Sequence, residues 1–235
     1  MGVCSKDDGI GFAMKIRVIP GILEDKGENK REEVEKKISK IVGIVDEVSI
    51  DIIDGKFVDN KTIGVGDLEN IDSQISLGVQ LMVEEPIKMV EECAEVGVEK
   101  VIGHIELMKD QKEFVAKVKE FKMKVGLGLD LKTGVDFLEE DILDEIDDIL
   151  LMSVAAGFSG QEFDGKVLGK IEKLRKEMGF KGNIWVDGGV NEKTIEKCVQ
   201  MGANRLSITS GIWKEKDIEK QIGKLQRLAE KAVTG

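Results

Sequence analysis

Asp51 is an acidic residue inside an apolar stretch of the chain. It lies in the run 48–53 (VSIDII), in which apolar residues alternate with other types, and a turn at Asp54–Gly55 follows. This alternation is typical of a buried strand. A buried ionised carboxylate is costly unless it is paired, bound to a metal or used in catalysis. Asp51 is therefore a candidate acid–base group; the alternative interpretation is that Asp51 and Asp54 only cap the next turn.

Three turns of small residues in the last third of the chain have the composition of an anion-binding site. They lie at 157–160 (GFSG), 188–189 (GG) and 210–211 (SG). Such turns expose backbone N–H groups, and in parallel barrels phosphate is typically bound by loops after the seventh and eighth strands. Any one of them alone could be purely structural, but three in succession favour phosphate binding. The predicted phosphate-binding residues are Gly157, Phe158, Ser159, Gly160, Gly188, Gly189, Ser210 and Gly211.

Short apolar runs that alternate with amphipathic segments must position these residues. Such alternation within one domain predicts an α/β protein, a single-domain TIM (β/α)8 barrel over residues 14–235, preceded by a short, disordered extension at 1–13. Segment 135–143 is one of the expected helices. In this fold the site lies at the carboxyl ends of the strands. The expected strands are 15–23, 48–53, 78–83, 100–105, 124–129, 148–154, 183–186 and 204–208.

Composition excludes several classes of function. The net charge of −11 disfavours nucleic-acid binding, which depends on Lys and Arg at phosphates. No apolar run is long enough to predict a membrane span. The three cysteines, Cys4, Cys93 and Cys198, form no CxxC motif, which indicates a reducing, cytoplasmic setting. His104 is the only histidine, so a zinc site with several histidines is excluded.

Several strings match a known family in order over Met14–Trp213. They are 48–64, 80–86 (QLMVEEP), 104–106 (HIE), 156–163, 186–194 (VDGGVNEKT) and 207–213 (SITSGIW). The chain resembles ribulose-phosphate 3-epimerases, TIM barrels that interconvert ribulose 5-phosphate and xylulose 5-phosphate with two aspartates and a divalent metal (zinc, iron or manganese). The resemblance implies that Asp51 and Asp187 are the catalytic pair, that the partner is a small phosphorylated sugar, and that the chain forms a homo-oligomer.

The sequence departs from this family at the metal site. The family binds its metal with two histidines and two aspartates, but Ser49 and Gln80 stand at the histidine positions. Neither side chain is a strong ligand for a zinc-like ion, so the metal ligands would be at most Asp51 and Asp187, and the resemblance predicts an epimerase with a degenerate metal site. His104 is predicted to line the site or to be structural, and the two methionines to pack in the barrel core or line its mouth. The residues expected around the site are Ser49, Gln80, Met82, His104 and Met152.

Three hypotheses follow from the sequence. The first is epimerisation of a ketose phosphate at carbon 3 by two-aspartate proton transfer through an enediolate. The second is another sugar-phosphate reaction on the same scaffold, that of an aldolase or a decarboxylase, in which Lys56 assists electrostatically. The third is a non-catalytic protein that binds a phosphorylated sugar.

Overall fold

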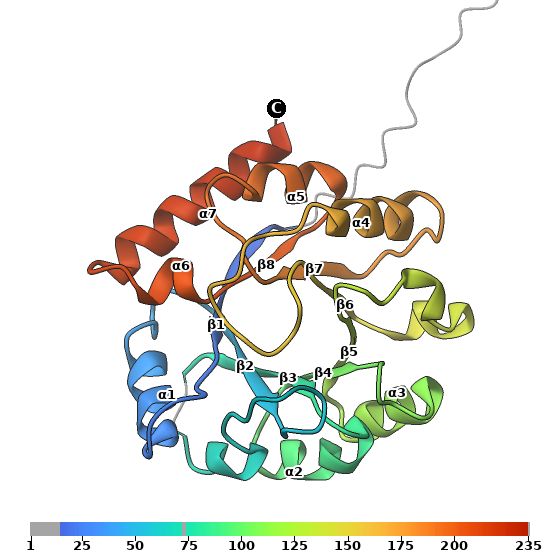
Figure 1. Cartoon of the computed structure of the whole chain (residues 1–235), viewed down its shortest axis with the longest axis horizontal. Coiled ribbons are helices and arrows are strands. Elements are labelled where there is room, and N and C mark those ends of the chain that lie inside the picture. The colour runs from blue at the N-terminus through green and yellow to red at the C-terminus, as the bar shows by residue number, and fades with distance from the viewer. Residues whose placement is uncertain (1–14, 72–73, 235) are drawn as a thin grey trace, which may run out of the picture.

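Eight parallel strands close into a barrel in sequence order, and helices surround it (Figure 1). The computed structural model describes residues 15–71 and 74–234, so the extension predicted at 1–13 lies outside the described residues. The predicted TIM barrel is confirmed. The strands are β1 (Arg17–Ile22), β2 (Glu47–Ile53), β3 (Ser76–Met82), β4 (Lys100–His104), β5 (Lys124–Leu129), β6 (Asp148–Met152), β7 (Asn183–Asp187) and β8 (Arg205–Ile208).

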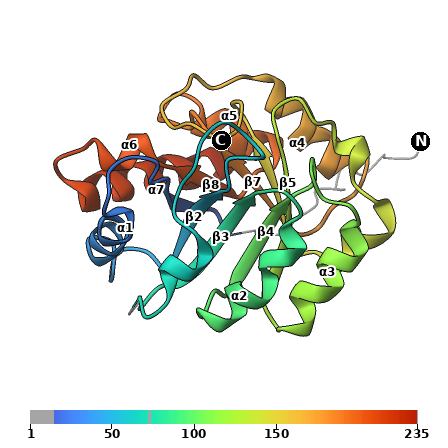
Figure 2. The same ribbon diagram turned by 60° about the horizontal axis from the view of Figure 1, so that its bottom comes forward.

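The outer layer consists of α-helices and short 3₁₀ segments, seen from the side in Figure 2. Within the described ranges, no helix is both long and apolar enough to cross a membrane. The α-helices are α1 (Lys30–Ser39), α2 (Val90–Glu95), α3 (Gln111–Glu120), α4 (Lys166–Lys176), α5 (Ile195–Met201), α6 (Ser210–Trp213) and α7 (Ile218–Thr234). The 3₁₀ segments are η1 (Val65–Leu68), η2 (Pro86–Met89), η3 (Val135–Phe137) and η4 (Glu140–Glu145).

The helix predicted at 135–143 is wrong, because η3 and η4 occupy this region instead. The apolar spacing is real, since Val135, Leu138 and Ile142 are buried. A regular helix would place Asp136 one turn before Glu140, and like charges at this spacing repel. Aspartate is also a poor helix former, so the segment buries its apolar residues in tighter, shorter turns.

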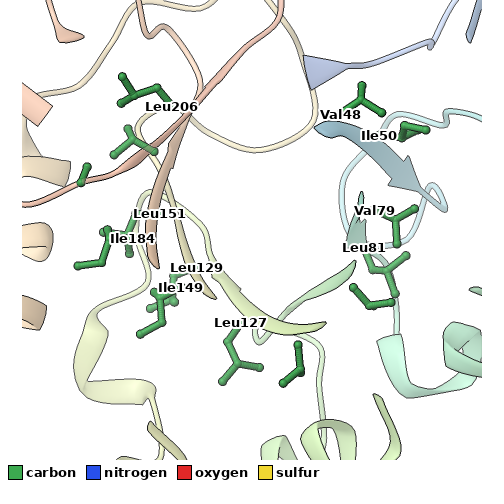
Figure 3. Packing of buried hydrophobic residues seen from close by; sticks show 14 of the residues in the cluster. Val48, Ile50, Val79, Leu81, Leu127, Leu129, Ile149, Leu151, Ile184 and Leu206 are labelled. Carbon is green, nitrogen blue, oxygen red and sulfur yellow. The ribbon is translucent and has the colours of Figure 1, made fainter. Parts of the chain in front are cut away.

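Both faces of the strands are buried, and the alternation of side chains decides which residues enter the barrel. Every residue of β2 is buried. Val48 and Ile50 belong to the core between strands and helices, together with the other outward-facing residues labelled in Figure 3. Because successive strand residues point to opposite faces, Ser49, Asp51 and Ile53 point into the barrel.

The inward-facing residues of β4, β6 and β7 form layers at successive heights along the barrel, and each layer is called a level here. Each strand begins with a polar residue, continues with an apolar one and ends at the mouth of the barrel. Ile102, Leu150 and Trp185 form the middle level and pack together in an inner apolar cluster. This level separates the polar groups at the two ends of the barrel. The series are Lys100–Ile102–His104 on β4, Asp148–Leu150–Met152 on β6 and Asn183–Trp185–Asp187 on β7.

A buried ion cluster closes the amino-terminal end of the barrel. Lys100 is 4% exposed, and its Nζ lies 2.5 Å from Glu47 Oε1 and 3.2 Å from Asp148 Oδ2. Trp185 Nε1 donates a 2.7 Å hydrogen bond to Asp148, and the Lys100 ammonium lies 4.5 Å from the centre of the Trp185 ring. Lys100 is therefore the cation in direct contact with both carboxylates, and the charge of Arg205 also attracts them.

Lys100→Met should lower the free energy of unfolding by about 3–5 kcal/mol, because it leaves two buried carboxylates without their cation while keeping the side-chain volume. Urea denaturation measures the loss. Lys112→Met is the control, since Lys112 makes an exposed ion pair with Asp141 and should leave stability essentially unchanged. Equal effects of the two substitutions would show that the buried cluster contributes no more than a surface ion pair.

Candidate active site

Asp51 and Asp187 border the same pocket at the carboxyl end of the barrel. They lie on β2 and β7 and are only 5% and 6% exposed. Asp51 does not cap the turn that follows it. That role belongs to Asp54, whose carboxylate accepts hydrogen bonds from the backbone N–H groups of Lys56, Phe57 and Glu84. The capping interpretation is therefore correct for Asp54 and wrong for Asp51.

The two aspartates have different electrostatic environments. Burial raises the pKa of Asp51 well above its ordinary value, and the nearby charge of Asp187 raises it further. Burial also raises the pKa of Asp187, but hydrogen bonds from Ser207 and from the Gly188 N–H, at 2.8 Å, act against this rise. The pKa of Asp51 is therefore raised more than that of Asp187, which makes Asp51 the better proton donor and Asp187 the better base of the pair. Two carboxyl groups whose proton affinities are pushed apart can act as an acid and a base.

The predicted phosphate-binding turns form one wall of this pocket. Gly188 and Gly189 have φ values of 93° and 62°, which glycine adopts readily. A Cβ on Gly189 would lie 2.6 Å from the Phe163 backbone nitrogen, so the turn has no room for a side chain. All eight residues predicted from the sequence border the pocket: Gly157, Phe158, Ser159, Gly160, Gly188, Gly189, Ser210 and Gly211.

Two loops cover the mouth of the barrel. The loop after β6, gold in Figure 1, reaches over the barrel centre, and the loop after β2 contacts it. Asn60 donates a hydrogen bond to the Gly157 carbonyl, and a Cβ on Gly157 would lie 2.6 Å from Val58. The cavity that remains has a volume of about 40 Å³, room for only a few water molecules.

Gln80 and His104 are fully buried below this pocket rather than in its lining. Gln80 Nε2 lies 3.1 Å from His104 Nε2 and 3.3 Å from Met152 Sδ. His104 Nδ1 lies 3.2 Å from Glu106 Oε2. Burial raises the pKa of Glu106, but hydrogen bonds from His104, Thr133 and the Asp130 N–H outweigh it and lower this pKa to about 2. His104 therefore supports the site through a hydrogen-bond chain.

The remaining residues expected around the site are two methionines and a serine, and they lie at different depths in the barrel. Met82 and Met152 border the pocket and also pack in the inner apolar cluster. They therefore both line the mouth of the barrel and belong to its core. Ser49 is buried on β2 opposite Gly78 of β3, one inward position before Asp51, and does not border the pocket.

Sequence reasoning missed residues that contact the aspartates or the pocket. Ser207 hydrogen-bonds Asp187, and Thr209 borders the pocket beside Ser210. Both lie in the string SITS at the end of β8. The signal was available, because a polar residue inside an apolar strand is the same pattern that identified Asp51. Glu106 was quoted only as part of a string, and its pairing with His104 depends on the path of the chain after β4.

The residues at the mouth do not fit the metal implied by the resemblance. Zinc and iron sites favour imidazole nitrogen, whereas this chain places a serine hydroxyl and a glutamine amide at the two histidine positions. The Gln80 amide nitrogen faces the ring of His104. In the part of the chain that the structure describes, no three His, Cys, Asp or Glu side chains gather into a group that could hold a metal ion. We therefore assign no chemical step to a metal.

Comparisons with known proteins agree on one family. The family model described as "Ribulose-phosphate 3 epimerase family" matches residues 17–213. Ribulose-phosphate 3-epimerase from Bacillus subtilis is 34% identical over 90% of this chain and 98% of its own. The Aquifex aeolicus enzyme of the same name is 37% identical over 83% of this chain and 89% of its own.

A solved structure supports the fold alone. The 3-hexulose-6-phosphate synthase of Salmonella typhimurium superposes with a TM-score of 0.66 at 14% identity, covering 92% of this chain and 100% of that chain. The family match over residues 17–213, with curated relatives more than 30% identical over most of both chains, shows that this chain belongs to the ribulose-phosphate 3-epimerase family.

Proposed function

We propose that this chain epimerises a ketose phosphate at carbon 3, with ribulose 5-phosphate and xylulose 5-phosphate as the substrate pair. The single observation that carries the proposal is that Asp51 and Asp187 border one enclosed pocket together with the glycine-rich turns. The curated relatives carry the name of this reaction.

The chemistry requires a base and an acid on opposite faces of the sugar. Asp187 takes the proton from carbon 3, which is acidified by the neighbouring ketone, and an enediolate forms. Asp51 then delivers its own proton to the other face of the same carbon. In the reverse direction the two roles exchange. Because the pKa of Asp51 is raised more than that of Asp187, Asp51 suits the role of proton donor and Asp187 the role of base.

Backbone N–H groups in the turns at 188–189 and 210–211 would bind the phosphate. Both turns border the pocket, and α6 begins at Ser210. A cradle of this kind needs no cluster of basic side chains, which agrees with the net charge of −11. The homo-oligomer expected from the resemblance stays a prediction.

The aldolase or decarboxylase alternative depended on Lys56, and the position of this residue weighs against it. Lys56 Nζ lies 2.5 Å from Glu84 Oε2 in an exposed ion pair, and Lys56 does not border the pocket. The non-catalytic alternative leaves unexplained why two buried carboxyl groups face the same pocket as the glycine-rich turns, because such a pair is costly unless it is used.

Asp51→Asn should slow formation of xylulose 5-phosphate from ribulose 5-phosphate by about 10²–10⁴-fold, because it removes the proton donor of the second face without changing the side-chain shape. The measurement is NMR of ribulose 5-phosphate in deuterated water, following deuterium at carbon 3 and formation of xylulose 5-phosphate. Lys56→Ala is the control and should keep the wild-type rate within about twofold. Full activity of Asp51→Asn would refute two-aspartate catalysis, and loss of activity in Lys56→Ala would revive the alternative chemistry.

Gly189→Ala should raise KM for the sugar phosphate and abolish the thermal stabilisation given by inorganic phosphate, because the new Cβ pushes against the Phe163 backbone. Gly165→Ala is the matched control, since Gly165 lies in the neighbouring loop with a negative φ and open space around it. Calorimetric melting with and without phosphate measures the effect. Unchanged phosphate stabilisation in Gly189→Ala would place the anion elsewhere.

A further inference from the structure

A buried hydrogen-bond chain runs from Glu106 through His104 to Gln80. Its distances are 3.2 Å between Glu106 Oε2 and His104 Nδ1 and 3.1 Å between His104 Nε2 and Gln80 Nε2. His104 and Gln80 are fully buried, and Glu106 is fixed in turn by a 2.6 Å hydrogen bond from the Asp130 N–H. The rings of Phe57 and His104 pack in a T-shaped arrangement, with their centroids 5.2 Å apart.

The direction of donation along this chain follows from its outer end. Glu106 is ionised and only accepts hydrogen bonds, so His104 Nδ1 carries a proton and donates it. His104 Nε2 faces the amide nitrogen of Gln80, which can only donate, so Nε2 accepts from the Gln80 N–H. The Gln80 amide is therefore oriented with its nitrogen toward His104. The other N–H of this amide lies 3.3 Å from Met152 Sδ, and the amide also lowers the pKa of Asp187 by hydrogen bonding.

This orientation is opposite to what a metal ligand needs. A ligand must turn a lone pair toward the ion, whereas the Gln80 amide nitrogen offers only N–H donors. An N–H donor aimed at a carboxylate stabilises its negative charge directly, as a cation would. Gln80 Oε1 is buried and has no hydrogen-bond partner among the described residues, and Gln80 does not border the pocket.

We propose that Gln80, held by His104 and Glu106, is a positioning residue that takes the place of the divalent metal, so that this chain epimerises its substrate without one. The inference rests on the proposed function. Its physical content is that a fixed amide donor orients the Asp187 carboxylate, which a loose or reversed amide would not do. Ser49 stands at the other histidine position of the family, so a hydroxyl replaces an imidazole there as well.

The first test uses the single histidine as a probe. Because the sequence contains one histidine, an untagged preparation gives unambiguous ¹H–¹⁵N signals for the His104 ring. We expect the Nδ1–H tautomer in metal-free protein, and no selective broadening of these signals by equimolar Mn²⁺. Broadening at substoichiometric Mn²⁺ that EDTA reverses would show a cation beside Gln80 and overturn the inference. This readout is independent of activity.

The second test separates positioning from structure. Gln80→Ala should lower kcat at least tenfold, leave KM within about twofold and shift the His104 Nε2 resonance. Gln226→Ala is the matched control, because Gln226 is a structural glutamine that bridges α7 to β1 through Ile16 and Val18. It should lower stability without changing kcat. A Gln80→Ala enzyme with wild-type kcat would refute the positioning role.

The third test restores the expected ligands. Ser49→His combined with Gln80→His should bind Zn²⁺ at least 100-fold more tightly than the wild type, measured by competition with a chelating dye. Equal Zn²⁺ affinity would overturn the inference. Exchange at carbon 3 that needs added metal refutes this inference and keeps the proposed function. Absence of exchange with and without metal refutes the proposed function, and the His104 spectra and Zn²⁺ affinities still decide whether a cation binds.

Discussion

In the closed barrel, every second side chain of each strand points into an interior without bulk water. Each polar group that points inward must therefore find a hydrogen-bond partner or an opposite charge within the protein. At the amino-terminal end Lys100 compensates two carboxylates as their shared cation. At the carboxyl end Asp51 and Asp187 face one another's charge without a lysine or arginine in the lining of their pocket. The apolar level of Ile102, Leu150 and Trp185 keeps the two polar ends apart. The two ends therefore hold their buried carboxylates differently, one end beside a lysine and the other beside a second carboxyl group.

This separation explains why the same residue type behaves differently at the two ends. A carboxylate beside a buried ammonium is held by an opposite charge, as Glu47 and Asp148 are held by Lys100. A buried carboxyl group beside another carboxylate has a raised pKa, as Asp51 has beside Asp187, and a raised pKa suits acid–base chemistry near neutral pH. The difference lies in whether a lysine reaches the carboxylates across the barrel interior, as Lys100 of β4 reaches Glu47 of β2 and Asp148 of β6.

Local patterns in the sequence predicted most of the fold and part of the site. Alternation in 48–53 was sufficient to place Asp51 inside the barrel, and the glycine turns were sufficient to place one wall of the pocket. The helix expected at 135–143 failed because like charges and aspartates act against a regular pattern of apolar residues. The link from Glu106 through His104 to Gln80 could not be predicted, because it depends on side chains from two strands and a loop meeting in the barrel.

The loops that cover the pocket affect how strongly the Gln80 amide acts on the Asp187 carboxylate. An amide dipole is a weak substitute for a divalent ion in water, where solvent screens it. Its effect on a carboxylate grows as the surroundings become less polar and water is excluded. Contacts between the loops after β2 and β6 leave a cavity of about 40 Å³, so the Gln80 amide acts on Asp187 with little competing solvent.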